Sequence, residues 1–280
     1  MFRIGVPIPI LGIDGHKWAG TEARLGIDGR KWAGTEARPY GSEGFTVDVE
    51  KANTLTLSIL EEASAYNQWV FDKVKPWLGK GILEVGCGIG NLTGLLLQAG
   101  KVVASDMNPL HLQRVDEKFG SHCNLSGVLL WDIQQDLSRD LPLSIDTILC
   151  SNVLEHVEDD DAVLSRFYRF LPQGGRLVLL VPALRILYNT FDRELGHFRR
   201  YTKRGLIQKF KRNRFHICSL KYFNFFGIFG WFVNGTLLRR RLLPAGQVRM
   251  FNQLVPLMVQ MERWVPTLIG QSLIAIGEKD

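Results

Sequence analysis

The chain has 280 residues, of which 46% are hydrophobic, and a formal net charge of +6 at pH 7. This length and composition allow one large domain or two small ones with a true hydrophobic core, and they exclude an intrinsically disordered protein. The four cysteines include no Cys-x-x-Cys pair and the six histidines show no metal-ligand spacing. We therefore predict no disulfide framework, no metal site and a reducing, cytoplasmic compartment.

The first predicted segment, residues 1–44, contains a tandem repeat. Residues 11–24 and 25–38 are identical except that His16 is replaced by Arg30. Two Gly-rich copies are too few to bury a core, since a solenoid needs at least about three repeats. The segment also lacks the uninterrupted apolar run of a signal peptide. We expect residues 1–44 to be a disordered tail and residues 45–280 to form the folded domain.

A glycine-rich turn follows the first predicted helices. Residues 49–78 carry apolar side chains at helical spacings of three and four, which predicts one or two amphipathic helices. Residues 82–93 then read ILEVGCGIGNLT, a short apolar run followed by three glycines at every second position. This pattern predicts a strand, a tight turn and a helix. Because glycines permit close approach and free helix amides bind polar groups, we expect a nucleotide-like cofactor there.

The glycine spacing discriminates between cofactors. The dinucleotide fingerprint Gly-x-Gly-x-x-Gly requires a third glycine at position 91, where this chain has Asn91. The run instead resembles motif I of the class I S-adenosylmethionine-dependent methyltransferases, Asp/Glu-x-Gly-x-Gly-x-Gly. The matching residues, which the resemblance together with Cys87 assigns to the binding of S-adenosylmethionine, are Glu84, Gly86, Gly88 and Gly90.

Acidic residues end the next two predicted strands. Asn91 is predicted to cap a helix over 92–99, and the strand over 101–105 ends at Asp106. A carboxylate there can accept hydrogen bonds from both ribose hydroxyls, and Met107 can pack on the adenine. The alternative for Asp106 is a turn residue.

A helix that starts at Asn108-Pro109 and stops at Gly120 precedes a third strand over 127–131. The resemblance implies that Asp132, with Ile133 beside it, bonds the adenine amino group. A plain loop aspartate is the alternative at this position.

The fourth predicted strand, 144–150, leads into a second motif. Asn152 to Val157 resembles the Asn-Val-Leu-Glu-His-Val run of small-molecule methyltransferases of the ubiquinone-biosynthesis and type 11 and 12 groups. This resemblance implies that Asn152 lines the methionine end of the cofactor and that His156 lies near the substrate entrance. Acidic residues 158–161 suit the start of a helix, and a fifth strand follows over 176–181. The alternation predicts a doubly wound parallel sheet.

A third motif follows the fifth strand. Residues 192–201 resemble an Asp…Gly-His-x-Arg-Arg-Tyr run found in a subset of bacterial methyltransferases of this superfamily. Its candidate substrate-site residues are His197, Arg199, Arg200 and Tyr201. Methyl transfer requires alignment, and it requires a base only if the acceptor must lose a proton. We predict His156 or His197 as that base and Tyr201 as a further catalytic candidate, with a structural role as the alternative for each histidine.

Strands predicted over 215–223 and 271–277 complete a seven-stranded Rossmann-like sheet, whose last strand runs antiparallel in the resembling superfamily. Residues 224–270 form a predicted apolar and basic helical insertion on the substrate side. The uncharged run 222–238 is shorter than the roughly 20 residues that span a membrane. A lid over an apolar substrate and peripheral contact with the inner face of a membrane through 222–241 remain open.

The expected function is methyl transfer from S-adenosylmethionine to a small or lipid-like acceptor. Between Arg193 and Arg241 the chain has 13 Lys or Arg residues against one acid, which suggests an RNA methyltransferase as an alternative. The run that begins at Asn152 differs, however, from the Asn/Asp-Pro-Pro-Tyr run of enzymes that methylate base amino groups, which disfavours nucleic acid. A membrane-associated module that binds the cofactor without turnover is a second alternative. The acceptor atom and the oligomeric state stay open.

Overall fold

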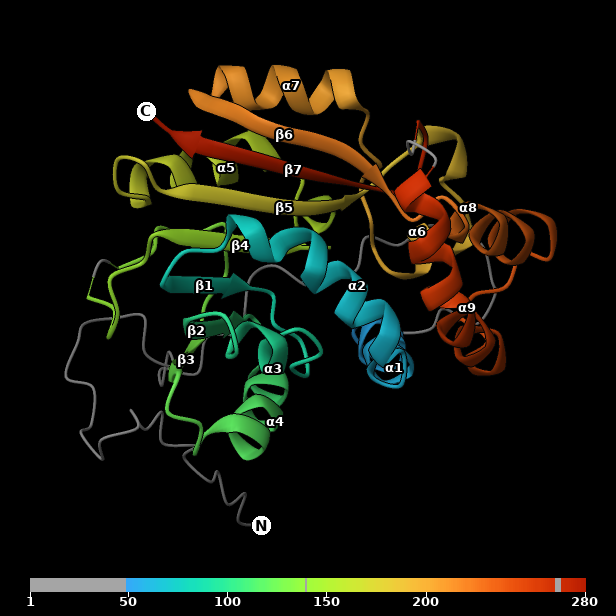
Figure 1. Ribbon diagram of the computed structural model, residues 1–280, viewed down its shortest axis with the longest axis horizontal. Helices are drawn as coiled ribbons and strands as arrows, with labels where there is room; N and C mark the ends of the chain where they lie inside the picture. Colours follow the sequence, from blue (N-terminus) through green and yellow to red (C-terminus); the bar gives the residue numbers. More distant parts are fainter. Residues whose placement is uncertain (1–48, 139, 265–267) are drawn as a thin grey trace, which may run out of the picture.

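Seven strands form one mixed sheet in the computed structural model, which describes residues 49–138, 140–264 and 268–280 (Figure 1). The strand order is β3-β2-β1-β4-β5-β7-β6. Their bounds are β1 Gly81–Val85, β2 Lys101–Asp106, β3 Leu125–Leu130, β4 Thr147–Ser151, β5 Arg176–Pro182, β6 Phe215–Phe223 and β7 Ser272–Lys279. The predicted tail, residues 1–44, lies outside the described residues.

Strand directions confirm the predicted Rossmann-like topology. Each pair among β1 to β5 is parallel, whereas β7 is antiparallel to both of its neighbours, β5 and β6. Strand β6 therefore runs in the same direction as β1. The carboxyl ends of these six strands meet at one edge of the sheet, which is where open α/β sheets bind their ligands.

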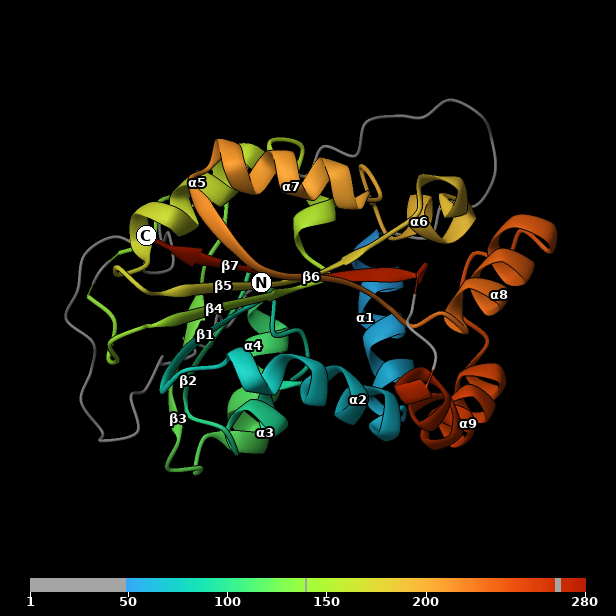
Figure 2. The same ribbon diagram turned by 45° about the horizontal axis from the view of Figure 1, so that its top comes forward.

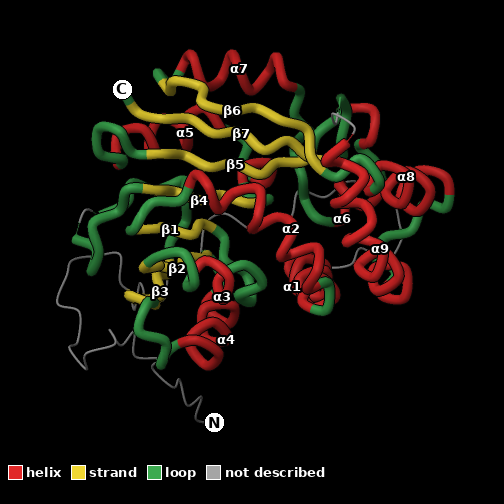
Figure 3. The backbone as a smooth tube through the Cα atoms, in the orientation of Figure 1, coloured by secondary structure: helices red, strands yellow, loops and turns green. Residues whose placement is uncertain are grey.

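The central strands are apolar on both sides because helices cover both faces of the sheet. All five residues of β1 are buried, and alternate residues belong to different core clusters, with Leu83 in one and Ile82 in the other. One face is covered by α5 (Asp160–Phe170) and α7 (Lys203–Arg212). The opposite face is covered by α2 (Ser64–Val74), α3 (Thr93–Leu96), α4 (Pro109–Phe119) and α9 (Ala245–Trp264), as Figures 2 and 3 show.

The predicted helix starts are confirmed for α4 and α5, but the predicted cap of α3 is not. Asn108 caps α4 by accepting a hydrogen bond from the Leu110 amide, and Asp159 caps α5 in the same way from Ala162. Helix α3 instead begins at Thr93, with Leu92 at its cap position and no side-chain cap. The predicted cap at Asn91 is wrong because its amide donates to the carbonyl of Leu57, in the preceding helix α1 (Val49–Glu61).

Most of the remaining elements lie beyond the carboxyl edge of the sheet. Short helices after β4 and β5 are η2 (Leu154–His156), η3 (Arg185–Leu187) and α6 (Thr190–Glu194). After β6 come α8 (Gly227–Trp231), the π-helical η4 (Phe232–Leu237) and α9, so the predicted insertion leaves from the ligand-binding edge. A further 3-10 helix, η1 (Lys75–Trp77), ends the entry helices. No helix among the described residues combines the length and apolarity needed to cross a membrane.

Candidate functional site

The loop after β1 has a backbone that only glycine adopts without strain. Gly86, Gly88 and Gly90 have φ angles of +68°, +53° and +91°. A Cβ at Gly88 would lie 2.9 Å from a methyl carbon of Leu57, and one at Gly90 would lie 2.8 Å from the ring of Phe119. The positive φ angles and the close neighbours both account for the three glycines.

Asp106 lies against this loop at the end of β2, as predicted. Its Oδ2 accepts a hydrogen bond of 2.8 Å from the Gly88 amide, and its Oδ1 accepts one of 2.8 Å from the Asn108 amide. The imidazole Nδ1 of His111 is 3.4 Å from the same Oδ1. The carboxylate is 9% exposed, so a hydroxyl-bearing ligand at this edge could meet both the acid and the glycine loop.

Glu84 fastens β1 to the helix that follows the loop. Its Oε2 accepts a hydrogen bond of 2.6 Å from the Thr93 hydroxyl, and the side chain is buried. Burial raises the pKa of Glu84 to about 8, the hydrogen bond from Thr93 opposes this shift, and the charge of Asp106 adds to it. Cys87 is also buried, and its amide donates to the carbonyl of Ser105 on β2. These contacts hold the shape of the loop.

The other predicted cofactor residues follow adjacent strands. Met107, after β2, is 62% exposed. After β3, Asp132 accepts a hydrogen bond from the Gln134 amide, while Ile133 is buried. After β4, Asn152 is exposed and has a φ of +52°. The fold thus brings the predicted cofactor residues to the carboxyl ends of four adjacent strands.

Helix α1 crosses the glycine loop and the start of α4. The carbonyl of Leu57 accepts a hydrogen bond from Asn91, and Glu50 accepts one of 2.8 Å from the Asn108 side chain. Thr54 is 3.1 Å from Nε2 of His111, and only Ala52 of this helix is buried. The helix therefore covers the loop and α4 mainly through polar links, together with the Leu57 side chain over Gly88.

A cluster of ionisable side chains lies beyond β4 on the same edge of the sheet. The rings of His156 and His197 meet edge to face at 4.6 Å. His197 Nδ1 is 2.9 Å from Oδ1 of Asp192, and its Nε2 is 3.9 Å from Oε1 of Glu155. Glu155 is 0% exposed, and neither of its carboxylate oxygens has a hydrogen-bond partner.

Burial and neighbouring charges shift the pKa values of three groups in this cluster, Glu155, His156 and Asp192. Burial raises the pKa of Glu155 to about 7, although the charges of His197 and Arg200 oppose the shift. Burial lowers the pKa of His156 to about 3, and the neighbouring His197 lowers it further, so His156 is neutral at pH 7. For Asp192, burial is outweighed by the hydrogen bond of His197 and the charge of Arg200, so its pKa lies below the ordinary value.

The tautomer of His197 follows from the partners of Asp192. An ionised carboxylate only accepts hydrogen bonds, so His197 donates through Nδ1, and in a neutral imidazole the acceptor nitrogen would then be Nε2, on the side of Glu155. Arg200 donates to the same oxygen at 2.8 Å, and the indole nitrogen of Trp231 donates to the other oxygen at 3.3 Å. Asp192 therefore connects the histidine pair to Trp231, at the end of α8, the first helix of the insertion.

The predicted residues Arg199, Arg200 and Tyr201 hold the segment in place. Tyr201 is 4% exposed and donates its hydroxyl proton to Asp160 at 2.8 Å, and burial together with that acid raises its pKa. Arg200 also donates to the carbonyl of Ala183, and Arg199 is 3.1 Å from Asp160. This geometry favours a structural role for Tyr201 over a catalytic one. Glu155 and Asp192 were not among the predicted site residues, although both lie inside the recognised motifs.

Glu155, His156 and His197 are also the described residues that could hold a metal ion. Each offers one ligand atom, and these atoms lie within 4.8 Å of one another. Two imidazoles and a carboxylate, with Asp192 orienting one imidazole, are a chemically suitable donor set for a divalent cation. The sequence did not reveal this cluster, because His156 and His197 lie far apart in the chain and show no metal-ligand spacing.

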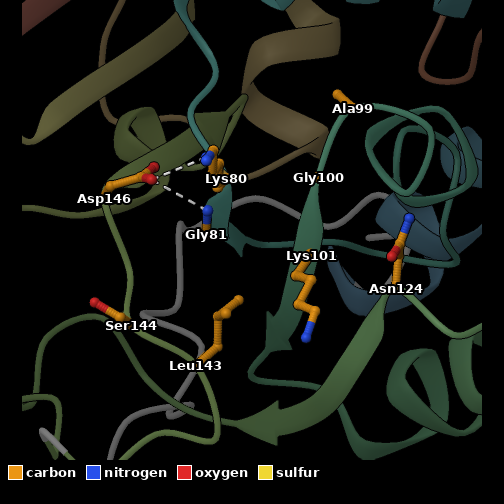
Figure 4. Close-up of a pocket in the computed structure, with 9 residues that line it drawn as sticks. All are labelled: Lys80, Gly81, Ala99, Gly100, Lys101, Asn124, Leu143, Ser144 and Asp146. Carbon is orange, nitrogen blue, oxygen red and sulfur yellow. Dashed lines mark hydrogen bonds between the residues drawn. The ribbon is translucent and has the colours of Figure 1, made fainter.

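A separate hollow of about 510 Å³ lies at the opposite edge of the sheet (Figure 4). Gly81 and Lys101, the first residues of β1 and β2, line it, and Asp146 accepts hydrogen bonds there from the amides of Lys80 and Gly81. Parallel sheets bind ligands at the carboxyl ends of their strands. This hollow is therefore not the cofactor site.

Comparison with known proteins supports the resemblance for part of the chain. Residues 83–177 match the model of a methyltransferase domain family. A ubiquinone biosynthesis O-methyltransferase of Pseudomonas entomophila is 31% identical over 118 residues, which cover 39% of this chain and 47% of that protein. The corresponding protein of Xanthomonas euvesicatoria is 36% identical over 105 residues, covering 36% and 42%. The chain thus spans less than half the length of these curated relatives.

A solved structure extends the comparison to the fold. A candidate sarcosine dimethylglycine methyltransferase from Galdieria sulphuraria superimposes with a TM-score of 0.52 and 13% identity, over 77% of this chain and 85% of that one. The matched family segment contains the glycine loop, Asp106, Asn152 and the Glu155-His156 pair, but it ends before His197. The predicted Rossmann-like fold is confirmed.

Proposed function

We propose that this chain, whose residues 83–177 match a methyltransferase domain family, transfers a methyl group from S-adenosylmethionine to a small or lipid-like acceptor. One contact supports the proposal above all others. The Cβ position of Gly86 is filled by the side chain of Val153, so the glycine loop touches the segment that carries Asn152, Glu155 and His156. A cofactor on the loop would therefore lie next to the histidine pair.

The residues around the loop fit this cofactor. The glycine amides and Asp106 would hold the ribose and the methionine end, Asp132 and Ile133 would hold the adenine, and Asn152 would close the methionine side. S-adenosylmethionine supplies an electrophilic methyl group on a sulfonium. The protein supplies alignment between that carbon and the acceptor atom, which is the main requirement of an in-line displacement.

His197 is the better candidate for a base if the acceptor must lose a proton. Asp192 accepts a hydrogen bond from Nδ1, so the neutral imidazole would have its acceptor nitrogen at Nε2, as a general base requires. His156 is neutral at pH 7 but its pKa of about 3 makes it a weak proton acceptor. Glu155, whose Oε1 is 3.9 Å from His197 Nε2, is a second titratable group beside this nitrogen, because burial raises its pKa to about 7.

The acceptor is proposed to be lipid-like because the insertion from β6 presents apolar side chains at the same edge. Residues 222–241 are also proposed to contact the inner face of a membrane, with the protein otherwise in the cytoplasm. A non-catalytic module and an RNA methyltransferase are the rival functions. Incubation of the protein with a cell extract and methyl-labelled S-adenosylmethionine separates the three: we expect label in the lipid or small-molecule fraction, whereas label in RNA or in no fraction would contradict the proposal.

The cofactor assignment has its own test. Gly88→Val should block the loop, since even a Cβ there lies 2.9 Å from Leu57, and Asp106→Ala should remove the ribose acceptor. We expect calorimetry to show an affinity for S-adenosylmethionine at least tenfold lower in each variant. Gly174→Val is the matched control, because Gly174 has a similar φ of +73° but no atoms within 4 Å of a Cβ. Unchanged affinity in both loop variants would disprove the cofactor assignment.

A further inference from the structure

Helix α9 has two apolar faces, and only one of them is packed. Val255 and Met258 are 2% and 9% exposed and belong to the core, with Phe251 and Val259 packed beside them. On another side, Met250, Leu254, Leu257 and Met261 are 58%, 43%, 57% and 47% exposed. Their spacing of four, three and four residues places them along one stripe of the helix. This stripe lies on the protein surface.

The preceding elements expose apolar side chains next to α9. The exposed large apolar side chains of α8, η4 and the turn after them are those of Phe229, Phe232, Val233, Leu237 and Leu238. The side chain of Asn234 in η4 donates a 2.7 Å hydrogen bond to Gln247 in the first turn of α9. Figures 1 and 2 both show α8 and α9 together beyond the ends of the strands. We call these five residues and the α9 stripe the outer face.

Basic side chains predominate around the outer face, and the nearby acid Glu62 forms an ion pair with Arg249 of α9. Residues 195–261 contain no Asp or Glu. Arg239, Arg240 and Arg241 form the turn between η4 and α9, and all three are exposed. Arg241 lies 3.5 Å from Glu194, but Arg239 and Arg240 form no ion pair with any described residue. The complement of this surface is therefore apolar and negatively charged.

We propose that the outer face docks on the surface of an anionic phospholipid bilayer, with the α9 stripe among the acyl chains and the arginine turn at the headgroups. A second copy of the chain fits less well, because a symmetric contact would bring arginine turns together. RNA offers no partner for nine exposed apolar side chains. This surface is distinct from the cofactor site and extends the predicted contact region, 222–241, to α9.

The outer face is linked by direct contacts to the residues around His197. Trp231, at the end of α8, donates its indole N–H to Asp192, and Asp192 orients His197. Arg200 lies 4.8 Å above the same indole ring. Helix α8, which carries part of the outer face, thus directly contacts α6, whose Asp192 orients His197.

Vesicle sedimentation of the full chain tests the proposal. We expect binding to vesicles that contain phosphatidylglycerol, weaker binding to phosphatidylcholine alone, and a decrease at high salt. Leu254→Glu with Leu257→Glu should weaken binding to the anionic vesicles at least tenfold. Gln253→Glu with Gln260→Glu is the matched control: it adds the same two charges at exposed positions of the same helix. The control should weaken binding less than threefold, because it leaves the stripe intact.

Three results would overturn the proposal: no binding of the wild type to anionic vesicles, equal binding by the two double variants, or a wild-type dimer that the leucine variant dissociates without any vesicle binding. Light scattering measures the last. Affinity for S-adenosylmethionine should match the wild type in both double variants, which shows that they fold. Since the vesicle assay contains no cofactor, a failure of the proposed methyl transfer would leave its result unchanged.

Discussion

Glu155 carries an ionisable group in a place that disfavours its charge. The side chain is fully buried, its two oxygens have no hydrogen-bond partner, and its pKa rises from 4.5 to about 7. The ionisable groups around it are His156, His197, Arg200 and Asp192. A raised carboxyl pKa means that the folded state binds more protons than the unfolded state between these two values. Its contribution to stability is complete below pH 4.5 and is lost as the pH rises through 7.

Glu155→Gln should remove this dependence. Relative to the wild type, the variant should gain on the order of 2–3 kcal/mol in free energy of unfolding between pH 5 and pH 8. Urea denaturation at a series of pH values measures the difference. Glu117→Gln, on the exposed side of α4, is the control and should keep the wild-type profile. A constant difference between the Glu155 variant and the wild type across this range would show that Glu155 titrates normally.

Single residues also show where sequence reasoning succeeds and fails. The spacing in motif I identified the three glycines that have positive φ angles in the structure. The predicted strand over 101–105 correctly placed Asp106 at the end of β2. Motif I could not reveal that Glu84 bonds Thr93, because strand and helix meet only in the folded chain. Tyr201 belongs to a recognised motif, yet its hydroxyl is held by Asp160 in the core.

Among the elements, α1 is the one held most weakly over the site. Only Ala52 is buried, and apart from the Leu57 side chain over Gly88 its links to the loop and α4 are polar. We expect its amides to exchange with deuterium much faster than those of α5, which buries Val163, Leu164 and Phe167. Saturating S-adenosylmethionine should slow exchange in α1 at least tenfold and leave α5 unchanged. Mass spectrometry measures both, and unchanged exchange in α1 would show that the helix does not respond to the cofactor.

The indole of Trp231 links α8 to Asp192 in α6. Trp231→Phe keeps a ring beneath Arg200 but removes the hydrogen bond to Asp192. We expect a loss of about 1 kcal/mol in the free energy of unfolding. Methyl transfer to a lipid extract should fall while the affinity for S-adenosylmethionine stays the same. Trp77→Phe serves as the control in η1, and equal effects of the two variants would argue against a specific role for Trp231.

Element order and strand edges were predictable because each strand is a short apolar run with turn residues behind it. The cap at Asn91 was not, because a carbonyl from α1 competes for that side chain. The sequence likewise predicted an apolar, partly helical segment around α9. It could not tell the packed face from the outer face, since both are apolar and the choice depends on where α2 lies.

At the scale of the whole molecule, the domain boundary stays a prediction. Residues 1–44 carry the tandem repeat, and the described fold begins at Val49 in α1. A chain beginning at Gly44 should fold and bind S-adenosylmethionine with the affinity of the full chain. Calorimetry and circular dichroism of the two chains measure this. A loss of binding in the shorter chain would show that the tail contributes to the site.

Strand β7 lies between β5 and β6 but follows both of them in sequence. During synthesis on the ribosome, α7, β6 and the insertion therefore emerge before the residues that join them to the sheet. Until Ser272–Lys279 are made, β5 and β6 each have an open edge toward the missing strand, which is an opportunity for wrong pairing or for chaperone binding. The arginine turn and the outer face thus leave the ribosome while the sheet behind them is still incomplete. The outer face can therefore contact a nearby bilayer before the sheet has finished folding.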